Sequence, residues 1–170
     1  MSSLYYYQFD ANLFISYLLN ENDLGRAVRS RLYSSNPGNS RVVITTSEVG
    51  EITKRLLKEY KKDDLPENIY KNISSLSKLV RDKRIKILRL QDIIKSKEDS
   101  INFLSTFRFL NDTLGFDDNR IQMNDRLHLS FFALTKAKIY YTADGHILNS
   151  TKIIDHFKKK YSKDIKELDG

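Results

Sequence analysis

The sequence contains no cysteine among its 170 residues, which excludes disulfide bonds and metal sites built on thiolates. Proline and glycine are scarce, with two and six residues, and no segment is repetitive or of low complexity. No basic stretch followed by a long apolar run occurs near the first residue, so we expect neither a signal peptide nor a membrane span. These absences predict a folded protein of the reducing cytoplasm.

Basic residues outnumber acidic ones, with 29 Lys and Arg against 22 Asp and Glu and a formal net charge of +7. A basic chain favours a polyanionic partner, nucleic acid above all. Lys-rich surfaces also serve solubility alone, so the charge favours nucleic acid only modestly. At this length we expect one domain, residues 1–170, with a buried core.

Short apolar segments alternate with helical patterns along the whole chain. The expected strands, which are rich in β-branched or aromatic residues, are 4–9, 41–45, 84–88 and 139–142. The expected helices are 13–19, 20–35, 45–60, 66–81, 92–114 in one or two pieces, one that begins near 125, and 151–168 with a short edge strand. The alternation is typical of an α/β protein, a three-layer sandwich with a central, mostly parallel sheet of four or five strands.

The spacing of apolar side chains predicts which face each helix buries. For the helix at 66–81 the predicted buried residues are Ile69, Ile73, Leu76 and Leu79. For the helix at 92–114 they are Ile101, Leu104, Phe107 and Leu110. For the helix near 125 they are Leu127, Phe131 and Leu134, with Leu129, Phe132, Ala133 and Ala137 widening the face.

Four acidic residues fall where strands end or where the next helices begin. Asp10 ends the first strand and Asp144 follows the last. Asp125 lies in a first helical turn, with Asn124 as the expected N-cap, and Glu51 lies beside a buried stripe. In an open α/β sheet such positions line one crevice. Each also has an ordinary explanation, because acids commonly cap helices and form turns.

Four segments, in order along the chain, resemble the PIN-domain nucleases and most closely the VapC-type toxin ribonucleases. YYYQFDANLFI (5–15) resembles the first strand of the family with its aspartate, and ITTSEVGEI (44–52) resembles the second-strand segment with its glutamate. DRLH (125–128) is similar to the helix start Asp-Ala-Leu-His, and YTAD (141–144) to the strand end Thr-x-Asp. The resemblance spans nearly the whole chain, although each motif is short.

The sequence departs from the family pattern in two places. His146 stands where the family often has a further acid, and the helical segments 63–81 and 92–114 are long. These differences concern the surroundings of Asp144 and the surface that would face a substrate.

The resemblance implies that Asp10, Glu51, Asp125 and Asp144 are the catalytic residues and the ligands of Mg²⁺ or Mn²⁺. Four carboxylates in one crevice repel one another and have raised pKa values unless cations are present. Hard divalent cations take oxygen ligands and make a bound water nucleophilic. The expected activity is therefore metal-dependent endonucleolytic hydrolysis of RNA, either single-stranded or structured.

The resemblance also implies an antitoxin protein as partner and a homodimer. An RNA-processing nuclease is a close alternative to a toxin, and a non-catalytic RNA-binding module on the same fold is an alternative of another class. A nucleotide-binding protein is disfavoured because no glycine-rich loop follows the first strand.

Several other residues have a functional and a structural interpretation. Asn12 and Thr142 are expected to orient carboxylates, although local turns explain both equally well. His128 shares the helical face of Asp125, and a packed, hydrogen-bonded histidine is preferred there over a metal ligand. His146 and His156 are expected at the surface.

Further residues have roles that the sequence leaves open. Thr45 and Glu48 have the spacing of a capping box, which gives Glu48 a structural role. The tyrosines at 5–7 are expected in a core strand rather than against bases. The residues that are candidates for a phosphate track are Lys54, Arg55, Arg120 and Arg126.

Overall fold

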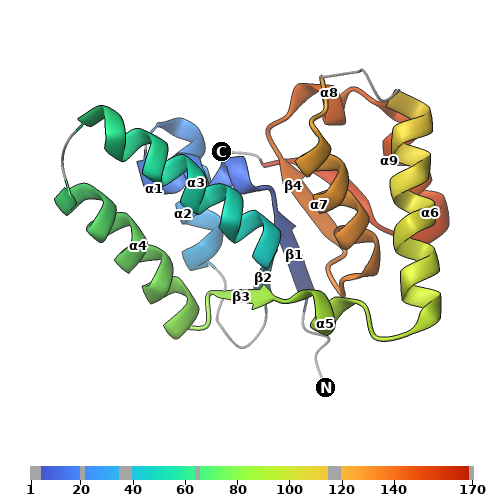
Figure 1. Ribbon diagram of the computed structural model, residues 1–170, viewed down its shortest axis with the longest axis horizontal. Helices are drawn as coiled ribbons and strands as arrows, with labels where there is room; N and C mark the ends of the chain where they lie inside the picture. Colours follow the sequence, from blue (N-terminus) through green and yellow to red (C-terminus); the bar gives the residue numbers. More distant parts are fainter. Residues whose placement is uncertain (1–4, 20–21, 35–39, 64–65, 115–119, 169–170) are drawn as a thin grey trace.

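A five-stranded sheet, parallel throughout, forms the centre of the protein (Figure 1). The computed structural model describes residues 5–19, 22–34, 40–63, 66–114 and 120–168. The strands, in their order across the sheet, are β3 (Ile85–Leu88), β2 (Ser40–Thr45), β1 (Tyr5–Phe9), β4 (Ile139–Thr142) and β5 (Asp164–Glu167). The predicted α/β class and parallel sheet are confirmed, and β5 is the edge strand predicted near the end of the chain.

Helices cover both faces of the sheet, which confirms the three layers (Figure 1). One face carries α1 (Ala11–Leu19), α2 (Asp23–Ser34), α3 (Thr46–Asp63) and α4 (Pro66–Arg81). The other carries α6 (Lys97–Leu114), α7 (Met123–Leu134) and α9 (Thr151–Tyr161), with the short helices α5 (Leu90–Ile93) and α8 (Gly145–Leu148) in the connections. In the described ranges, no helix has the length and hydrophobicity needed to cross a membrane.

Side chains along the strands point alternately into the two cores, as the two-residue period of a strand requires. Val42 and Ile44 belong to the core under α1–α4, whereas Val43 belongs to the core under α6, α7 and α9. In β4, Tyr141 and Tyr140 divide in the same way. Because both faces are buried, the strands contain apolar residues in succession instead of alternating with polar ones.

The buried face of α6 differs from the prediction. Ile101 and Leu104 are 55% and 63% exposed, and Leu110 is the only residue of the predicted stripe that is buried. The helix has aromatic side chains on more than one face, and it packs through them instead. Phe103 contacts Phe131 of α7, and Phe109 stacks on His156 of α9. The apolar periodicity of the sequence therefore predicted the wrong face of α6 to be buried.

Smaller differences occur in α4 and α7. Ile73 is 48% exposed although it was predicted to be buried, while Leu79 is fully buried as predicted. The side chain of Ile69 lies outside the described part of the structure. In α7 the predicted stripe is only half-buried, and the residues predicted to widen it, such as Leu129 and Phe132, are the fully buried ones. The sheet and α6 contact this helix from different sides, so its burial extends almost all round.

Candidate active site

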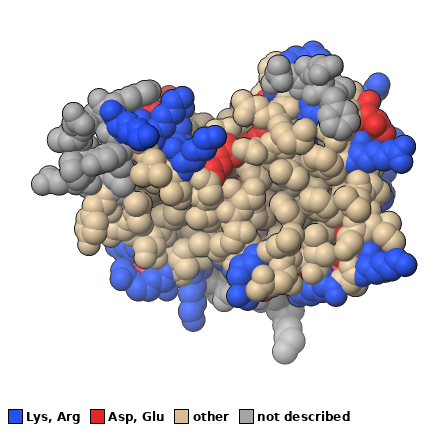
Figure 2. Space-filling view, in the orientation of Figure 1, with Lys and Arg blue, Asp and Glu red and all other residues tan. Residues whose placement is uncertain are grey.

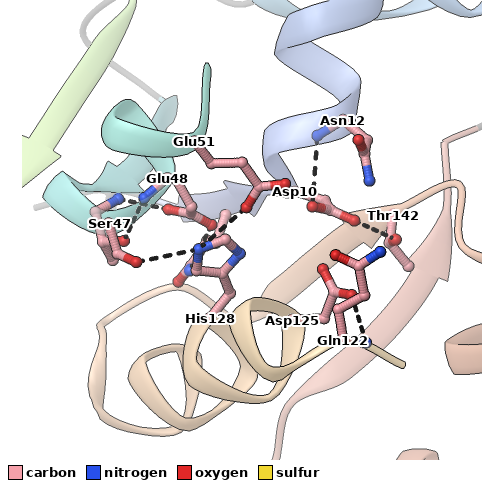
Figure 3. Close-up of polar contacts among 11 residues, drawn as sticks. Asp10, Asn12, Ser47, Glu48, Glu51, Gln122, Asp125, His128 and Thr142 are labelled. Atoms are coloured by element: carbon pink, nitrogen blue, oxygen red, sulfur yellow. Dashed lines mark hydrogen bonds and ion pairs between the residues drawn. The ribbon is translucent and has the colours of Figure 1, made fainter. Parts of the chain in front are cut away.

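All four predicted acids lie at one end of the sheet. The chain leaves the central strand β1 towards β2 and β3 and later returns to β4 and β5, so the carboxyl ends of β1 and β4 meet at a topological switch point. Asp10 directly follows β1, and Asp144 follows β4 after one residue. Asp125 lies in the first turn of α7 and Glu51 in the second turn of α3. Figure 3 shows Asp10, Glu51 and Asp125 around a shared space.

Asp10 is buried and is held from two sides (Figure 3). The Thr142 hydroxyl donates a hydrogen bond to Asp10 Oδ2 at 2.7 Å, and the backbone N–H of Asn12 approaches Oδ1 at 3.5 Å. Burial raises the pKa of Asp10, and the nearby charge of Asp144 adds to this effect, while the Thr142 hydrogen bond opposes it. The orienting role expected for Thr142 therefore has a geometric basis, but Asn12 acts through its backbone and its side chain is exposed.

Asp125 is held by the start of α7. The N-cap is Gln122 and not Asn124 as predicted, because Asp125 Oδ2 accepts the Gln122 N–H at 3.1 Å in a capping box. The helix thus begins earlier than expected, and Asn124 is exposed. Burial raises the pKa of Asp125 to about 7, with further contributions from the charges of Asp10, Glu51 and Asp144. Asp144 is thus within electrostatic range of the other acids, and its own carboxylate caps α8 by accepting the His146 N–H.

His128 is completely buried beside these acids. Its Nε2 lies 3.3 Å from Ser47 Oγ and 3.7 Å from Glu51 Oε2. Burial lowers the pKa of His128 to about 4, so the ring is neutral near pH 7 and the contact with Glu51 is not an ion pair. The distance of 3.7 Å is also too long for a hydrogen bond. The prediction of a packed, hydrogen-bonded histidine is confirmed in its contact with Ser47.

Glu51 is partly buried, and its pKa is raised by that burial and by the charge of Asp10, while Lys54 acts in the opposite direction. Its Oε2 is buried and has no hydrogen-bond partner among the described residues. The carboxylate therefore has unused ligand capacity at the oxygen that lies beside His128.

Three polar residues beneath the acids were not predicted as part of this region. Glu48 forms the predicted capping box with Thr45, but it is also fully buried and accepts a hydrogen bond from Gln8 Nε2 at 3.1 Å. Burial raises the pKa of Glu48 to about 8. Tyr140 is buried, and its hydroxyl has no partner among the described residues. Gln8 was detectable in the sequence, as a polar residue inside an aromatic strand, whereas nothing marks Tyr140.

The donor set suits a divalent cation. Ligand atoms of Asp10, Asp125 and His128 lie within 4.8 Å of one another. Carboxylate oxygens are the ligands that Mg²⁺ and Mn²⁺ prefer, and a neutral imidazole adds a nitrogen ligand for transition metals. The raised pKa values indicate that the carboxylates are electrostatically unfavourable alone, and Glu51 Oε2 and His128 Nδ1 are buried with no partner in the described part of the chain. A cation among these side chains would neutralise the carboxylate charges and would give the two atoms without partners a ligand bond.

Basic residues occupy part of the rim. Figure 2 shows acidic side chains at the floor of a hollow with Lys and Arg beside them. Lys54 and Arg55 of α3 are exposed, as a phosphate track requires, and Arg120 is exposed as well. The prediction for Arg126 is wrong, because its guanidinium is fully buried and donates to Ile121 O and to Asn111 Oδ1.

The two remaining histidines lie away from this set. His146 is exposed, as predicted. His156 is half-buried rather than at the surface, because its ring stacks on Phe109 with 3.7 Å between ring centroids. An aromatic neighbour contributed by another helix is not visible in sequence spacing.

The fold has a counterpart among solved structures. The chain is similar to a chain of the crystal structure of VapBC2 from Rickettsia felis bound to a DNA fragment from their promoter. The TM-score is 0.59 at 17% sequence identity, and the alignment covers 96% of this chain and 99% of that one. No protein-family model and no curated protein sequence matches. At this identity the likeness concerns the fold, which is PIN-like.

Proposed function

We propose that this protein is a metal-dependent endoribonuclease that hydrolyses RNA phosphodiester bonds in the cytoplasm as the toxin of a toxin–antitoxin pair. One observation carries the proposal: four carboxylates from four separate segments converge outside the carboxyl ends of β1 and β4. Asp10 and Asp125 are buried, and Glu51 and Asp144 are partly buried. Such a concentration of mutually repelling acids destabilises a fold, so a ligand that neutralises them is the simplest reason for it.

Asp10, Glu51, Asp125 and Asp144 would hold Mg²⁺ or Mn²⁺. When bound, the ion supplies a nucleophilic water and neutralises charge on the scissile phosphate and the leaving oxygen. The protein fixes the positions of the carboxylates: Thr142 holds Asp10 and the start of α7 holds Asp125. Asp125, whose pKa is about 7, keeps part of its proton near neutral pH in the absence of the ion and would release it when the ion binds.

The rim supports RNA as the substrate. Lys54 and Arg55 are exposed, one turn from Glu51 on the same helix, and Lys54 acts on the Glu51 carboxylate while Arg55 pairs with Glu59. These charges would attract the phosphates of a bound RNA. The net charge of +7 favours a polyanion in the same way.

The toxin assignment is supported by the fold. VapBC2 is a two-component complex on promoter DNA, and the chain aligns over almost the whole length of its matching chain. We infer an antitoxin partner and a homodimer for this protein on that likeness. An RNA-processing nuclease would share the same acids and would differ in having no antitoxin.

The test is the cleavage of an end-labelled single-stranded RNA by the purified protein with Mn²⁺, with Mg²⁺ or with EDTA. We expect cleavage that requires metal and that is lost in the double variant Asp10→Asn, Asp125→Asn. The matched control is Asp155→Asn, because Asp155 is an exposed acid on α9 that pairs with Lys159 and is not one of the four acids. Equal cleavage by the double variant would assign the activity to a contaminant or another site. RNA binding without cleavage would instead identify a non-catalytic RNA-binding module.

A further inference from the structure

His128 lies on the same face of α7 as Asp125, one turn further along the helix. Its side chain is completely buried, and Figure 3 shows the ring between Ser47 and Asp125. One ring nitrogen lies within 4.8 Å of carboxylate oxygens of both Asp10 and Asp125. These three residues therefore form a compact group with two oxygen donors and one nitrogen donor.

The contacts of the ring indicate how it is oriented. Nε2 lies 3.3 Å from the Ser47 hydroxyl, within hydrogen-bond distance, and 3.7 Å from the Glu51 carboxylate, which is beyond that distance. A tautomer with the proton on Nε2, donated to Ser47 Oγ, fits these contacts. A proton on Nε2 leaves a lone pair on Nδ1, which is buried and has no partner in the described ranges. A buried acceptor without a partner is unfavourable, so Nδ1 is available to a ligand outside the described residues.

The same arrangement is typical of histidines that bind metals. A metal-ligating histidine usually presents its other ring nitrogen to a carboxylate, a carbonyl or a hydroxyl, which fixes the tautomer and the ring orientation. Ser47 and Glu51 occupy that position here. Mg²⁺ strongly prefers oxygen ligands, whereas first-row transition metal ions accept imidazole nitrogen.

We propose that His128 is a nitrogen ligand of the ion held by Asp10 and Asp125, with Ser47 and Glu51 orienting its ring, and that it makes the centre selective for a divalent transition metal ion over Mg²⁺. This inference rests on the proposed function, because it concerns the same ion. It assigns to His128 a role that an all-carboxylate centre would not have.

The test uses the whole protein loaded with Mn²⁺ and pulsed electron paramagnetic resonance, which detects nitrogen bound to the metal. We expect nitrogen coupling in the native protein, and its loss in His128→Asn, which replaces the imidazole by a smaller amide. The matched control is His146→Gln, because His146 is two residues from Asp144 but exposed. By calorimetry, His128→Asn should lower the affinity for Mn²⁺ roughly tenfold or more, with a smaller effect on Mg²⁺.

The outcomes separate this inference from the proposed function. Mn²⁺ bound without nitrogen coupling, in a protein that still cleaves RNA, would overturn the role of His128 and leave a carboxylate centre. Nitrogen coupling would also be absent if a water molecule, and not the metal ion, bound Nδ1, and the role of His128 as a ligand would then be overturned as well. Absence of Mn²⁺ binding would overturn both proposals. If His128→Asn does not fold, the spectra of the native protein and of His146→Gln are compared. Nitrogen coupling that is retained in His146→Gln then assigns the nitrogen ligand to His128, because the third histidine, His156, is stacked on Phe109.

Discussion

Asp10 and Asp125 of the candidate site are each held in place by hydrogen bonds, but their burial beside other carboxylates is electrostatically unfavourable. Asp10 and Asp125 each accept hydrogen bonds that favour the charged form, yet the pKa values of both are raised because burial and neighbouring carboxylates outweigh those bonds. A carboxylate away from other acids can show the opposite balance. The half-buried Asp92 has a pKa lowered to about 2 by its hydrogen bonds with Arg89. The contrast is between a carboxylate paired with a cation and one that is buried among other acids.

This imbalance predicts a pH-dependent effect of Asp125→Asn. The pKa of Asp125 is about 7 in the folded protein against 3.8 for the free side chain. Between pH 3.8 and about 7 the folded protein keeps a proton on Asp125 that the unfolded chain has lost, so the free energy of unfolding falls as the pH rises. The whole of this loss in stability is present above about pH 7. In EDTA at pH 8 the variant should have a free energy of unfolding higher by on the order of 3 kcal/mol. Near pH 4 the two proteins should be equal.

The measurement is urea unfolding in EDTA at both pH values. Asp155→Asn serves as the control, because this exposed acid should give no difference between the two conditions. With saturating Mn²⁺ the order should reverse at pH 8, since the native protein then gains stability from ion binding that the variant has lost. A variant that is less stable than the native protein in EDTA at pH 8 would mean that burial and the neighbouring carboxylates do not raise the pKa of Asp125 as described.

At the scale of elements, both ends of α7 have specific partners. Its first turn is closed by Gln122 and Asp125, and its last carbonyls are bound by Lys163, which precedes β5. The Lys163 ammonium is buried and donates to the carbonyl oxygens of Phe132, Thr135 and Ala137 at 2.6–2.8 Å. Burial lowers the pKa of Lys163 to about 7, but three acceptors at a negative helix end favour the ammonium, because the neutral amine has only two hydrogens to donate.

We therefore predict that Lys163→Met destabilises the protein. Methionine fills a similar volume but removes the ammonium donor of three carbonyls at and just after the end of α7, of which that of Phe132 keeps the Thr135 hydroxyl. The free energy of unfolding should fall by roughly 3 kcal/mol, measured by urea denaturation at pH 7. Lys166→Met, at an exposed position of β5, is the matched control and should change it by less than about 0.5 kcal/mol. Equal effects of the two substitutions would show that Lys163 is not the partner of these carbonyls.

The positions of the strands and of the acids that follow them could be read from the sequence. The strands were predicted correctly, because strand position follows from short β-branched and aromatic runs. Parallel topology then places Asp10 and Asp144 at the same end of the sheet, whereas their role in catalysis stays a prediction. The contacts between elements were not predictable. Arg126 was expected near phosphate, but Asn111 of α6 and the carbonyl of Ile121 bind it in the interior. Likewise, only the tertiary structure shows Tyr140 beneath the acids, since its pKa is raised by burial and then by their charges.

At the scale of the whole molecule, α6 presents an apolar row to the surface. Ile101 and Leu104 are 55% and 63% exposed and lie one turn apart, and Phe107 continues the row half-buried. Neighbouring exposed apolar side chains on one helix are typical of a protein interface. A second copy of the chain is the partner that the resemblance implies, and a two-fold axis would place this row against itself.

We therefore expect a dimer that Leu104→Glu dissociates, because each copy would bring a carboxylate into the interface opposite its symmetry mate. Sedimentation velocity across a range of protein concentrations measures the shift from dimer to monomer, and circular dichroism checks that the variant is folded. The matched control is Tyr70→Glu, which places the same charge at an exposed aromatic position of α4 and should leave the dimer intact. A native protein that is monomeric at every concentration would contradict the expected homodimer. Dissociation by Tyr70→Glu alone would place the dimer interface on α4.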